Sequence, residues 1–477
     1  MTTNTRNPIL DTDSYKFSHF KQYPPGTTEV SAYIEARPGA AFDSITFFGL
    51  QMFLKEKLAQ KITAKDVYEA EALVTAHMPG VPFNRAAWDT VVNELGGVLP
   101  LEVTALPEGM TVPVGTPLAQ VRNTDPRFPW LTTYIETALL RAVWYPSTVA
   151  TQSREAKKLI YAGLVRSSND PDGQIPFKLH DFGARGTTSA EQAGIGGAAH
   201  LVNFMGTDTV EALVYAQRYY GAAMPGYSIA AAEHSTITSW GRAGEADAYA
   251  NMVKTFGGEG KLVAVVSDSY DIRNAVSALW GGKLKSLVTE TGGTMVIRPD
   301  SGDPVETPVW VMQELARTFG ATKNAKGYLV LNPSVRIIQG DGMNLGTIKA
   351  LVERVIDAGF AIDNIAFGMG GGLLQKLDRD TMRFAMKANE AIVRGERRDV
   401  SKSPVTDTTK ASKAGRVKVI KNADGRIVTV REDDASHTAA PNLLQPVWRD
   451  GKLVRDWTFD QVRAHAQLVD TEVQKAA

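Results

Sequence analysis

Short apolar runs recur through the middle of the chain, and they constrain the fold more than any other feature of the sequence. Each run ends in glycine or in a charged residue, and a stretch with helical spacing of apolar residues follows it. Strands that alternate with helices in this way form βα units around a parallel sheet. The six runs lie at 177–183, 200–208, 262–269, 294–302, 335–342 and 364–372.

The density of these units favours a (β/α) barrel as the central domain. Six units within 177–372 suit a barrel better than a sandwich, although an open doubly wound sheet has the same local pattern. We therefore predict an α/β fold with a catalytic (β/α) barrel over 150–395. In such barrels, functional groups lie just after the carboxyl ends of the strands.

The segments on either side of the barrel predict a second, β-rich domain. Residues 101–122 are β-rich and punctuated by proline and glycine, and the tail has two hairpin signals, at Asp424-Gly425 and Asp450-Gly451. We expect the N-terminal segment, 1–149, to supply helices and the first half of this domain. The C-terminal segment, 396–477, is expected to complete it with hairpins and a closing helix.

Two helix boundaries are also predicted. In 130–146 apolar residues recur at spacings of three and four, and Pro146 is expected to end that helix. Thr458 and Gln461 form a capping-box pattern, which predicts the start of the closing helix.

Charge and composition exclude several classes of function. The 477 residues include 52 Lys and Arg against 52 Asp and Glu, which argues against binding of nucleic acid or a membrane surface through bulk charge. There is no cysteine, so disulfides, thiolate nucleophiles and zinc–thiolate sites are excluded. The N-terminus has no apolar signal segment, and no run of 18 apolar residues occurs. We expect a soluble, cytoplasmic protein without nucleic-acid or membrane partners.

Charged residues gather directly behind the strand-like runs. The stretch TMVIRPDSGDP, 294–304, places an arginine, two aspartates and a serine behind an apolar run, where its glycine and proline alone would supply a turn. These charges indicate a place that holds a charged ligand, although a solvated loop has the same composition. The residues at such positions are Asp181, Arg185, Asp208, Asp268, Arg298, Asp300 and Asp341.

A glycine cluster follows the last run. In AFGMGGGLLQKLDRD, 366–380, three consecutive glycines open a helical stretch and expose backbone N–H groups that can wrap an anion. Late βα loops are the usual phosphate site of barrels, and Lys376 and Arg379 add full charges. A plain tight turn explains the glycines about equally well.

Two histidines lie in contrasting surroundings. His200, in an apolar stretch, is interpreted as a core residue, whereas His234 follows Glu233 among small residues that leave room for a ligand. No histidine spacing points to a structural metal site, and no serine nucleophile motif occurs. Arginines, strand-end aspartates and a glycine cradle suit a phosphate-rich sugar substrate with Mg²⁺, on which catalysis is positioning and electrostatics.

A series of motifs then resembles the nicotinamide phosphoribosyltransferases, in order and from about residue 8 to about residue 470. They are TDSYK, HDFGARG, AGIGGAAHLVNFMGTDTV, PGYSIAAAEHSTIT, VVSDSYDI, IRPDSGDP, IQGDG, FGMGGGLLQKLDRD and FDQVRAHAQL. The resemblance implies a type II phosphoribosyltransferase, a homodimer with a (β/α) barrel and a split β domain. Such enzymes make nicotinamide mononucleotide and pyrophosphate from nicotinamide and phosphoribosyl pyrophosphate, in NAD salvage.

The resemblance also assigns the base site. Phe182 would stack on one face of the nicotinamide ring and Tyr15 of the other subunit on the opposite face. Asp208 would accept a hydrogen bond from the carboxamide, and Ser228 is assigned to substrate binding. The nearest alternative is a nicotinate phosphoribosyltransferase, which Asp208 disfavours because its carboxylate would repel the acid. A second alternative is a non-catalytic dimeric ligand-binding relative.

The remaining residues are assigned to the phosphoribosyl donor by the same resemblance. Mg²⁺ would be held mainly through the substrate phosphates, so no protein ligand to a metal is assigned. ATP would act as a co-substrate that phosphorylates His234. The catalytic residues would be His234, Asp268, Arg298 and Asp300. The phosphates of the donor would contact Arg185, His234, Arg298 and Gly371, and the ribose hydroxyls would contact Asp300, Asp341 and Gly340. The phosphates bound in the neighbouring subunit would contact Arg37, Arg379 and Lys387.

Three positions depart from the family pattern. Ala184 takes the place of a tyrosine familiar from animal members, Met369 replaces a serine beside the glycine cradle, and Ala385 replaces a phosphate-side serine. The loop after Arg37 is also shorter. These departures bear on the affinity for phosphates rather than on the reaction.

Overall fold

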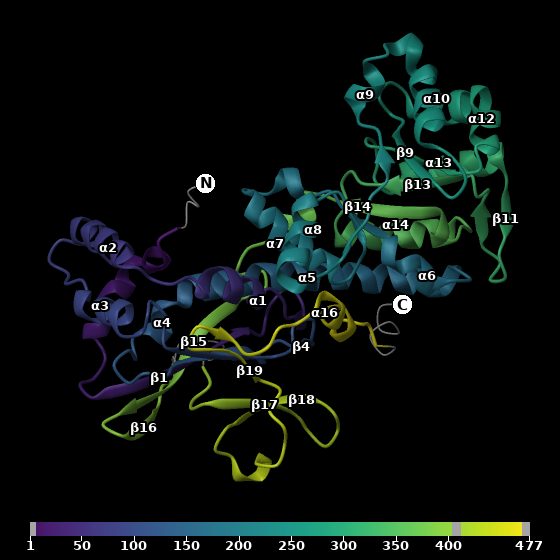
Figure 1. The fold of residues 1–477 in the computed structure, drawn as a ribbon. Coiled ribbons are helices and arrows are strands. Elements are labelled where there is room, and N and C mark those ends of the chain that lie inside the picture. The colour runs from purple at the N-terminus through teal and green to yellow at the C-terminus, as the bar shows by residue number, and fades with distance from the viewer. Residues whose placement is uncertain (1–5, 403–411, 470–477) are drawn as a thin grey trace. The chain divides into compact units, whose positions relative to one another are not determined.

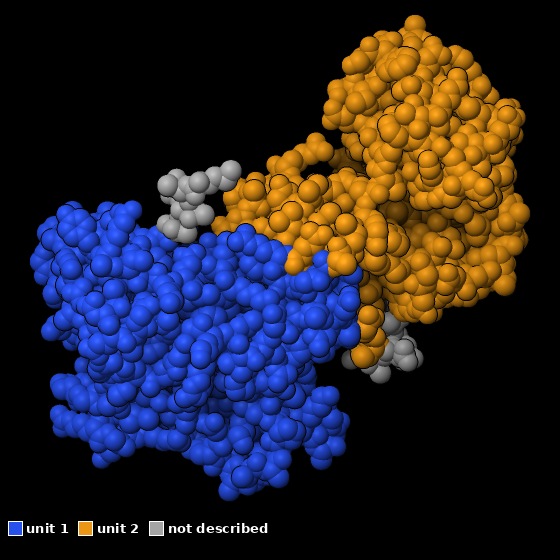
Figure 2. Space-filling model, in the orientation of Figure 1, with its two compact units in different colours: residues 1–151, 218–222, 378–466 blue, residues 152–217, 223–377, 467–477 orange. Residues whose placement is uncertain are grey.

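The computed structural model describes residues 6–402 and 412–469, and the chain divides into two compact units. Unit 1 consists of Met1–Thr151, Arg218–Ala222 and Asp378–Ala466. Unit 2 consists of Gln152–Gln217, Ala223–Leu377 and Gln467–Ala477 (Figure 2).

Unit 2 is built on a seven-stranded sheet in which every paired strand is parallel (Figure 1). The strand order is β7-β6-β14-β13-β10-β9-β8. A parallel bridge between Gly206 and Tyr227 joins the edge strand β7 to the segment leading into β8, so the sheet curls until its edges meet. The strands are β6 (Leu179–Asp181), β7 (Gly206–Thr207), β8 (Ala230–Ala231), β9 (Leu262–Val266), β10 (Thr294–Arg298), β13 (Val335–Gln339) and β14 (Ile365–Met369).

This topology confirms the predicted (β/α) barrel. Each of the six apolar runs contains one strand, and neighbours along the chain are neighbours around the sheet. The strand β8 was not predicted, because two alanines carry neither the β-branched nor the aromatic character that marks a strand.

Helices connect the strands, and their buried residues show why they pack on a sheet. α14 (Leu345–Asp357) buries Ile348, Leu351, Val352 and Val355, which lie on one face at spacings of three, four and seven. The other helices of this region are α6 (Pro171–Gln174), α7 (Ala190–Leu201), α8 (Val210–Tyr220), α9 (His234–Thr238), α10 (Glu245–Phe256), α11 (Ile272–Asn274), α12 (Lys285–Glu290), α13 (Glu306–Phe319) and α15 (Gly371–Leu374), with a short hairpin of β11 (Ala321–Lys323) and β12 (Leu329–Leu331).

Unit 1 contains a seven-stranded antiparallel sheet made from both ends of the chain, as predicted for the β-rich domain. Its order is β16-β15-β1-β5-β3-β19-β20. The segment limits predicted at 149 and 395 stay predictions, and β15 is a strand of this sheet. The strands are β1 (Thr27–Ala36), β3 (Leu101–Ala105), β5 (Pro117–Asn123), β15 (Phe384–Val393), β16 (Glu396–Asp399), β19 (Gln445–Arg449) and β20 (Lys452–Leu453).

The local signals of the tail are confirmed. β17 (Val417–Lys421) and β18 (Ile427–Arg431) form a hairpin around Gly425, which has a positive φ of 77°. β19 and β20 turn at Asp450 and Gly451, both with positive φ. α16 (Phe459–His465) begins at Thr458, whose capping box with Gln461 is formed.

Helices pack against the sheet of unit 1 and enclose its core. Trp88, Trp130 and Tyr134 meet edge to face there, with ring centroids 5.2 to 5.4 Å apart. The remaining elements are η1 (Pro8–Leu10), η2 (Ser14–Lys21), β2 (Ser44–Thr46), α1 (Leu50–Phe53), η3 (Leu54–Leu58), α2 (Ala64–His77), α3 (Arg85–Asn93), β4 (Thr111–Pro113), α4 (Leu131–Tyr134) and α5 (Glu136–Ser167).

The predicted helix end at Pro146 is wrong, because α5 runs through this proline to Ser167. The ring of Pro146 lies where a side chain at Gly49 would be, since a Cβ on that glycine would come within 2.3 Å of the ring. On both sides of the proline the helix is buried, through Val143 and Val149. Tertiary packing therefore outweighs the local cost of proline in a helix.

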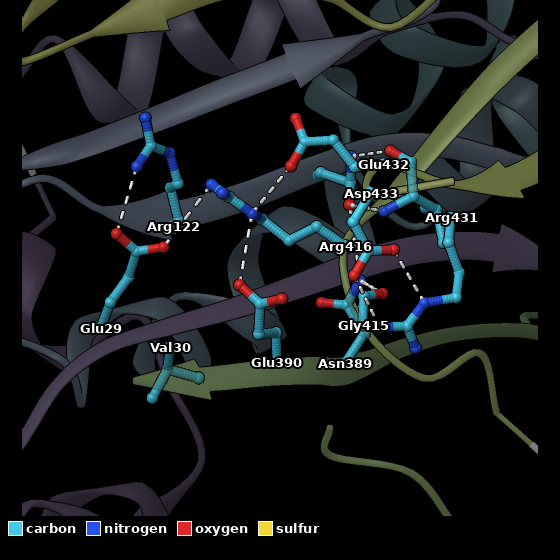
Figure 3. A network of polar contacts seen from close by, with 12 residues as sticks. Glu29, Val30, Arg122, Asn389, Glu390, Gly415, Arg416, Arg431, Glu432 and Asp433 are labelled. Carbon is cyan, nitrogen blue, oxygen red and sulfur yellow. Dashed lines mark hydrogen bonds and ion pairs between the residues drawn. The ribbon is translucent and has the colours of Figure 1, made fainter. Parts of the chain in front are cut away.

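A network of charged side chains lies between the sheet of unit 1 and the β17–β18 hairpin (Figure 3). Arg122 binds Glu29 at 3.1 Å and Glu102 at 2.9 Å. Arg416, just before β17, lies 3.3 Å from Glu390 and 3.0 Å from Glu432. The hairpin is tied to the sheet through these pairs.

None of the helices formed by residues 6–402 and 412–469 combines the length and the apolar character that a membrane crossing requires.

Candidate functional site at the barrel mouth

The predicted site residues of unit 2 follow the carboxyl ends of the barrel strands. Because the strands are parallel, these ends lie at one end of the barrel, which is called the mouth here. Arg185 is exposed on a short 3₁₀ turn after β6, and Ser228 comes just before β8. The others are Phe182 after β6, Asp208 after β7, His234 after β8, Asp268 after β9, Arg298 and Asp300 at the end of β10, Gly340 and Asp341 after β13, and Gly371 after β14.

His234 lies among three polar groups from the loops after β9 and β10. Its Nδ1 is 3.0 Å from Ser269 Oγ, and its Nε2 is 3.3 Å from Asp300 Oδ2 and 3.9 Å from Asp268 Oδ1. About half of the side chain, 47 %, is exposed. The ring is therefore oriented by side chains that reach it from neighbouring strands, while one side stays open to a ligand.

Glu233 does not orient the His234 ring. Its side chain caps the first turn of α9, where it accepts a hydrogen bond from Ser235 Oγ and forms a capping box with Thr236. Adjacent residues point apart here, and this explains why the carboxylate beside His234 in the sequence is not beside it in space.

Asp268, Arg298 and Asp300 form a linked charge group next to His234. Asp268 Oδ2 accepts hydrogen bonds from Asp300 N at 3.1 Å and from Ser301 Oγ, and Arg298 Nη2 donates to Asp300 Oδ2 at 3.1 Å. Two buried atoms of this group, Asp268 Oδ1 and Arg298 Nε, have no hydrogen-bond partner among the described residues. At the mouth, Asp268 Oδ1 can therefore accept, and Arg298 Nε can donate, one further hydrogen bond.

Asp208 is held by two donors on the same oxygen. Ser228 Oγ donates to Asp208 Oδ1 at 2.5 Å, and His180 Nε2 lies 2.8 Å from that atom. Burial raises the pKa of Asp208, but the hydrogen bond and charge of His180 and the hydrogen bond of Ser228 outweigh it and hold the pKa below its ordinary value. Asp208 is therefore an ionised acceptor.

The ring of Phe182 lies against two glycines of neighbouring strands. A Cβ on Gly368 would come within 2.0 Å of Phe182 Cε2, and one on Gly340 within 3.0 Å of the same atom. His180 is two residues away on the same strand, with ring centroids 5.1 Å apart. Because these two glycines have no side chain, the ring of Phe182 fits against their backbone at the mouth.

The glycine cradle after β14 is held by two glutamine side chains and has open space beside Gly371. Gly372 O accepts a hydrogen bond from Gln152 Nε2 at 2.6 Å, and Leu374 O accepts one from Gln192 Nε2 at 3.2 Å. A Cβ on Gly371 would meet nothing within 4 Å. Met369, one of the departures from the family pattern, is buried, so its side chain belongs to the packing of β14.

Four of the predicted residues belong to unit 1. Tyr15 is 55 % exposed on η2. Arg37 Nε donates to Arg383 O at 3.0 Å, and Arg379 pairs with its neighbour Asp380 at 3.2 Å.

Lys387, on β15, is the fourth of them and lies among charges of both signs. Burial lowers its pKa, and the charges of Arg37 and Lys402 lower it further, whereas the carboxylates of Glu136 and Glu35 raise it. Ala385, the third departure, is buried on the same strand.

Three residues of the mouth were missed from the sequence: His180, Ser269 and Gly368. His180 comes one residue before the predicted Asp181, which is itself buried and accepts a hydrogen bond from Gly183 N. A period of two along a strand could have found His180, since it shares a face with Phe182. His200, interpreted as a core residue, is fully buried and stacked on Phe204.

The mouth offers separate regions for separate chemistries. An aromatic ring with an ionised carboxylate suits a flat ring that carries hydrogen-bond donors. Arginines, a histidine and open backbone N–H groups suit phosphate. Within the described residues, no three His, Asp or Glu side chains are arranged to hold a metal ion by themselves.

Comparison with known proteins gives matches along most of the chain. Residues 177–450 match the nicotinate phosphoribosyltransferase (NAPRTase) family, and residues 7–103 match the N-terminal domain of nicotinamide phosphoribosyltransferase. A protein of Xanthomonas campestris pv. campestris named nicotinamide phosphoribosyltransferase is 50 % identical over 463 residues, 96 % of this chain and 98 % of that one. A protein of the same name from Acinetobacter baylyi is 32 % identical over 96 % of both chains.

Two crystal structures share the fold at low sequence identity. The nicotinate-nucleotide pyrophosphorylase of Pyrococcus furiosus superposes with a TM-score of 0.63 at 17 % identity, over 100 % of this chain and 98 % of that one. Human nicotinic acid phosphoribosyltransferase gives a TM-score of 0.58 at 16 % identity, over 97 % and 95 % of the two chains.

Proposed function

The chain belongs to the nicotinate phosphoribosyltransferase family of enzymes, and we propose that it converts nicotinamide and phosphoribosyl pyrophosphate into nicotinamide mononucleotide and pyrophosphate, a step of NAD salvage. Relatives at 50 % and 32 % identity carry the name of this activity. The observation that carries the choice of substrate is Asp208, an ionised acceptor beside the ring of Phe182.

Asp208 separates nicotinamide from nicotinate by charge. The amide group of nicotinamide has two N–H donors, which an ionised carboxylate accepts. Nicotinate has a carboxylate at the same place, and two like charges at hydrogen-bond distance repel each other. Phe182 and, across a dimer, the exposed Tyr15 would hold the ring itself by stacking.

The phosphoribosyl donor would occupy the other side of the mouth. Arg185 and Arg298 supply charge for the phosphates, and the backbone N–H groups at Gly371 suit the 5-phosphate. The carboxylates of Asp300 and Asp341, with the backbone of Gly340, suit the ribose hydroxyls. Charges of both signs belong side by side here, because the donor carries phosphate next to sugar.

Bond cleavage needs electrostatic help rather than a general base. The C1–O bond to pyrophosphate breaks with its electron pair on oxygen, which leaves an oxocarbenium-like ribose. The lone pair of the pyridine nitrogen forms the new bond to C1, and no proton has to leave that nitrogen. Arg298 would stabilise the charge that develops on the departing diphosphate, a contribution typical of positioned charges in a closed site.

The carboxylates of Asp268 and Asp300 fit Mg²⁺, which prefers oxygen ligands and usually takes one or two carboxylates along with substrate phosphates. Asp268 Oδ1, buried without a hydrogen-bond partner among the described residues, is the atom best placed for this role. When bound, the ion would supply positive charge for the pyrophosphate. The remaining ligands would come from phosphate oxygens and water.

His234 is proposed to take a phosphoryl group from ATP. A ring nitrogen would form the P–N bond as the bond between the γ-phosphorus and the bridging oxygen breaks, and ADP leaves with that electron pair. Ser269 and Asp300 orient the ring, while Arg298, bound to the same Asp300, supplies a cation for the transferred group. Negative charge fixed there would help to retain pyrophosphate together with Mg²⁺ and so favour synthesis.

A homodimer with shared sites is part of this proposal. Arg37, Arg379 and Lys387 would meet the phosphates of the neighbouring subunit. Mixing an inactive Tyr15→Ala chain with an inactive Asp208→Ala chain should restore activity, since one hybrid site is intact. No recovery in confirmed heterodimers would refute shared sites.

A side-by-side assay of nicotinamide and nicotinate tests the activity. The wild type should form mononucleotide from nicotinamide with a much larger kcat/KM than from nicotinate. Asp208→Asn should lower this ratio, because it removes the repelling charge, and should weaken nicotinamide binding by about 1.5–3 kcal/mol. A preference for nicotinate, or no turnover of either base, would overturn the proposal.

Labelled ATP tests the role of His234. With γ-labelled ATP the wild type should acquire acid-labile, base-stable label, and ATP should stimulate mononucleotide synthesis. His234→Ala should lose both. If it is labelled as well as the wild type, His234 is a phosphate ligand only.

A further inference from the structure

His180 has no part in the function proposed above, yet it makes a direct contact with the residue that selects the base. Its Nε2 lies 2.8 Å from Asp208 Oδ1, and its side chain is 14 % exposed. Because Asp208 is ionised, Nε2 must carry the proton and donate it, whichever charge state the imidazole has. The contact therefore holds the carboxylate through a hydrogen bond.

The ring of His180 packs against Gly206, where the absence of a side chain leaves room for the imidazole. His180 stands opposite Gly206 in the register of β6 and β7, and a Cβ on Gly206 would come within 2.7 Å of His180 Nδ1. Phe182 packs beside the ring from the same face of β6. The imidazole thus has a defined place between the strand backbone and the aromatic ring of the base site.

The two hydrogen bonds donated to Asp208 Oδ1 determine which hydrogen-bonding groups remain available to a ligand. Ser228 also donates to this oxygen, at 2.5 Å, so the single hydroxyl proton of Ser228 is already committed. Toward a ligand, Ser228 Oγ can then offer only its lone pairs, and Asp208 Oδ2 is likewise an acceptor. An amide NH₂ satisfies two such acceptors, whereas a carboxylate satisfies neither.

We propose that His180 is a positioning residue for base specificity, which holds Asp208 and through it Ser228 as paired acceptors for the amide group of the substrate. This inference rests on the proposed function. It assigns the discrimination between an amide and an acid to a chain of three residues from β6, β7 and the segment before β8, rather than to Asp208 alone.

Two substitutions at position 180 separate the hydrogen bond from the volume of the side chain. His180→Leu keeps a similar volume and removes the donor, and it should raise the KM for nicotinamide about tenfold while the KM for phosphoribosyl pyrophosphate stays within about twofold. His180→Gln places an amide N–H where Nε2 was, and it should stay within about threefold of the wild type for both substrates. Gly206→Ala, which displaces the ring, should resemble His180→Leu.

A double-mutant cycle tests whether His180 acts through Asp208. In an Asp208→Asn background, His180→Leu should cause no further rise in the KM for nicotinamide, since the carboxylate that it orients is gone. A merely structural effect of His180→Leu would persist in that background and would raise both KM values. Either result, or an unchanged KM for nicotinamide in His180→Leu, would overturn the inference.

The outcomes distinguish this inference from the function on which it rests. If the wild type does not convert nicotinamide, the proposed function fails before any variant is made. If the wild type is active and His180→Leu shows the wild-type KM for nicotinamide, only the role of His180 fails. Direct binding of nicotinamide by calorimetry, on variants shown to be folded by their thermal unfolding, provides the same comparison without turnover.

Discussion

The two units each contain a cluster of arginines and carboxylates, and the two clusters are built differently. In unit 1, Arg122 and Arg416 lie between glutamates that come from the sheet and from the β17–β18 hairpin (Figure 3). In unit 2, Arg298 pairs with one carboxylate, that of Asp300, at 3.1 Å. Among the described residues both clusters contain buried atoms without a hydrogen-bond partner: Glu29 Oε1, Glu390 Oε1 and Arg416 Nε in unit 1, and Asp268 Oδ1 and Arg298 Nε in unit 2. The clusters differ in the number of opposite charges around each arginine: the cluster of unit 1, with two or three carboxylates for each arginine, is called the closed cluster, and that of unit 2, with one carboxylate for Arg298, the incomplete cluster.

The difference lies in how each cluster is compensated. Removing charge from water costs free energy, which partners recover when they surround the charge. Arg416 has carboxylates within 3.0 to 3.7 Å from three directions, so its charge is balanced within unit 1. At the mouth, Asp268 Oδ1 lies 3.9 Å from His234 Nε2 and Arg298 pairs with the single carboxylate of Asp300, so fewer opposite charges compensate this cluster and a charged ligand would add to them. The closed cluster is therefore expected to serve stability, and the incomplete one binding.

The largest effect is expected from Arg298→Ala. Losing a positioned cation at a site of developing negative charge should lower kcat/KM by about 10²–10³-fold. The free energy of unfolding should change little, because the substitution also removes a buried N–H without a partner. Steady-state kinetics and urea unfolding measure the two quantities on the same preparation. A loss of several kcal/mol in stability would mean that this cluster, too, is structural.

Arg416→Met should give the opposite result. It leaves the buried Glu390 without its cation and also removes a partner of the exposed Glu432, so the free energy of unfolding should fall by about 2–3 kcal/mol. The activity per folded molecule should stay close to that of the wild type. Arg127→Met is the matched control, since Arg127 is an exposed arginine with two carboxylate partners and its loss should lower the free energy of unfolding much less. Equal effects of the two substitutions would contradict the assignment of the closed cluster to stability.

The sequence predicts the position of the mouth better than its contacts. Apolar runs mark six of the seven barrel strands, and parallel strands place their carboxyl ends together, so Asp208, Asp268 and Asp300 were found from position alone. The sequence does not show which of these residues form hydrogen bonds with one another. The bond between Ser228 and Asp208 spans 20 residues and that between His180 and Asp208 spans 28, and each depends on the order and register of strands around the barrel.

Local signals were least informative where packing decides. Pro146 would end an isolated helix, but α5 continues because it is buried on both sides. β8 has too little β character to be recognised, and it exists because it pairs with β9 while Tyr227, in the segment leading into β8, bridges to Gly206 of β7. The role of Gly368 is likewise invisible in the sequence, because it depends on a ring from another strand.

Lys178 extends the comparison of closed and incomplete charge sites to unit 2 alone. It lies in the same unit as the mouth, but its Nζ is surrounded by backbone carbonyl groups. It lies at the amino end of β6, where its Nζ donates to Ile362 O at 2.9 Å, Asp363 O at 3.2 Å and Ile365 O at 3.0 Å. Burial lowers the pKa of Lys178 to about 7. Below this pH, both the folded and the unfolded chain carry the proton, and the cost of burying the charge is fully present.

The expected consequence is a pH-dependent difference between the wild type and Lys178→Met. As the pH rises from about 7 toward the ordinary lysine value, the folded chain has lost a proton that the unfolded chain keeps, so stability rises with pH. The wild type should gain up to about 1.4 kcal/mol per pH unit relative to Lys178→Met between pH 7.5 and 9.5. Urea unfolding at several pH values measures this slope. A difference that is constant over this range would show that the folded-state pKa of Lys178 is not lowered.

The smallest effect is expected from Gly368→Ala, which adds one methyl group at the base site. The new Cβ would come within 2.0 Å of Phe182 Cε2 and 2.4 Å of Cδ2, so the ring must move. If Phe182 stacks on nicotinamide, its displacement should raise the KM for nicotinamide about tenfold, in line with the roughly 1–1.5 kcal/mol of a lost aromatic contact. The KM for phosphoribosyl pyrophosphate should stay within about twofold, because the phosphate cluster of Arg298 and Asp300 is not touched.

Gly340→Ala is the matched control for this substitution. Its Cβ would stand 3.0 Å from the same ring atom, a distance that a small shift of the ring relieves, so its effect on the KM for nicotinamide should be the weaker of the two. Equal effects on the KM values of both substrates would indicate a general disturbance of the mouth. A rise confined to nicotinamide would show that the incomplete cluster and the aromatic site are separate parts of the mouth, each open to a different portion of the substrates.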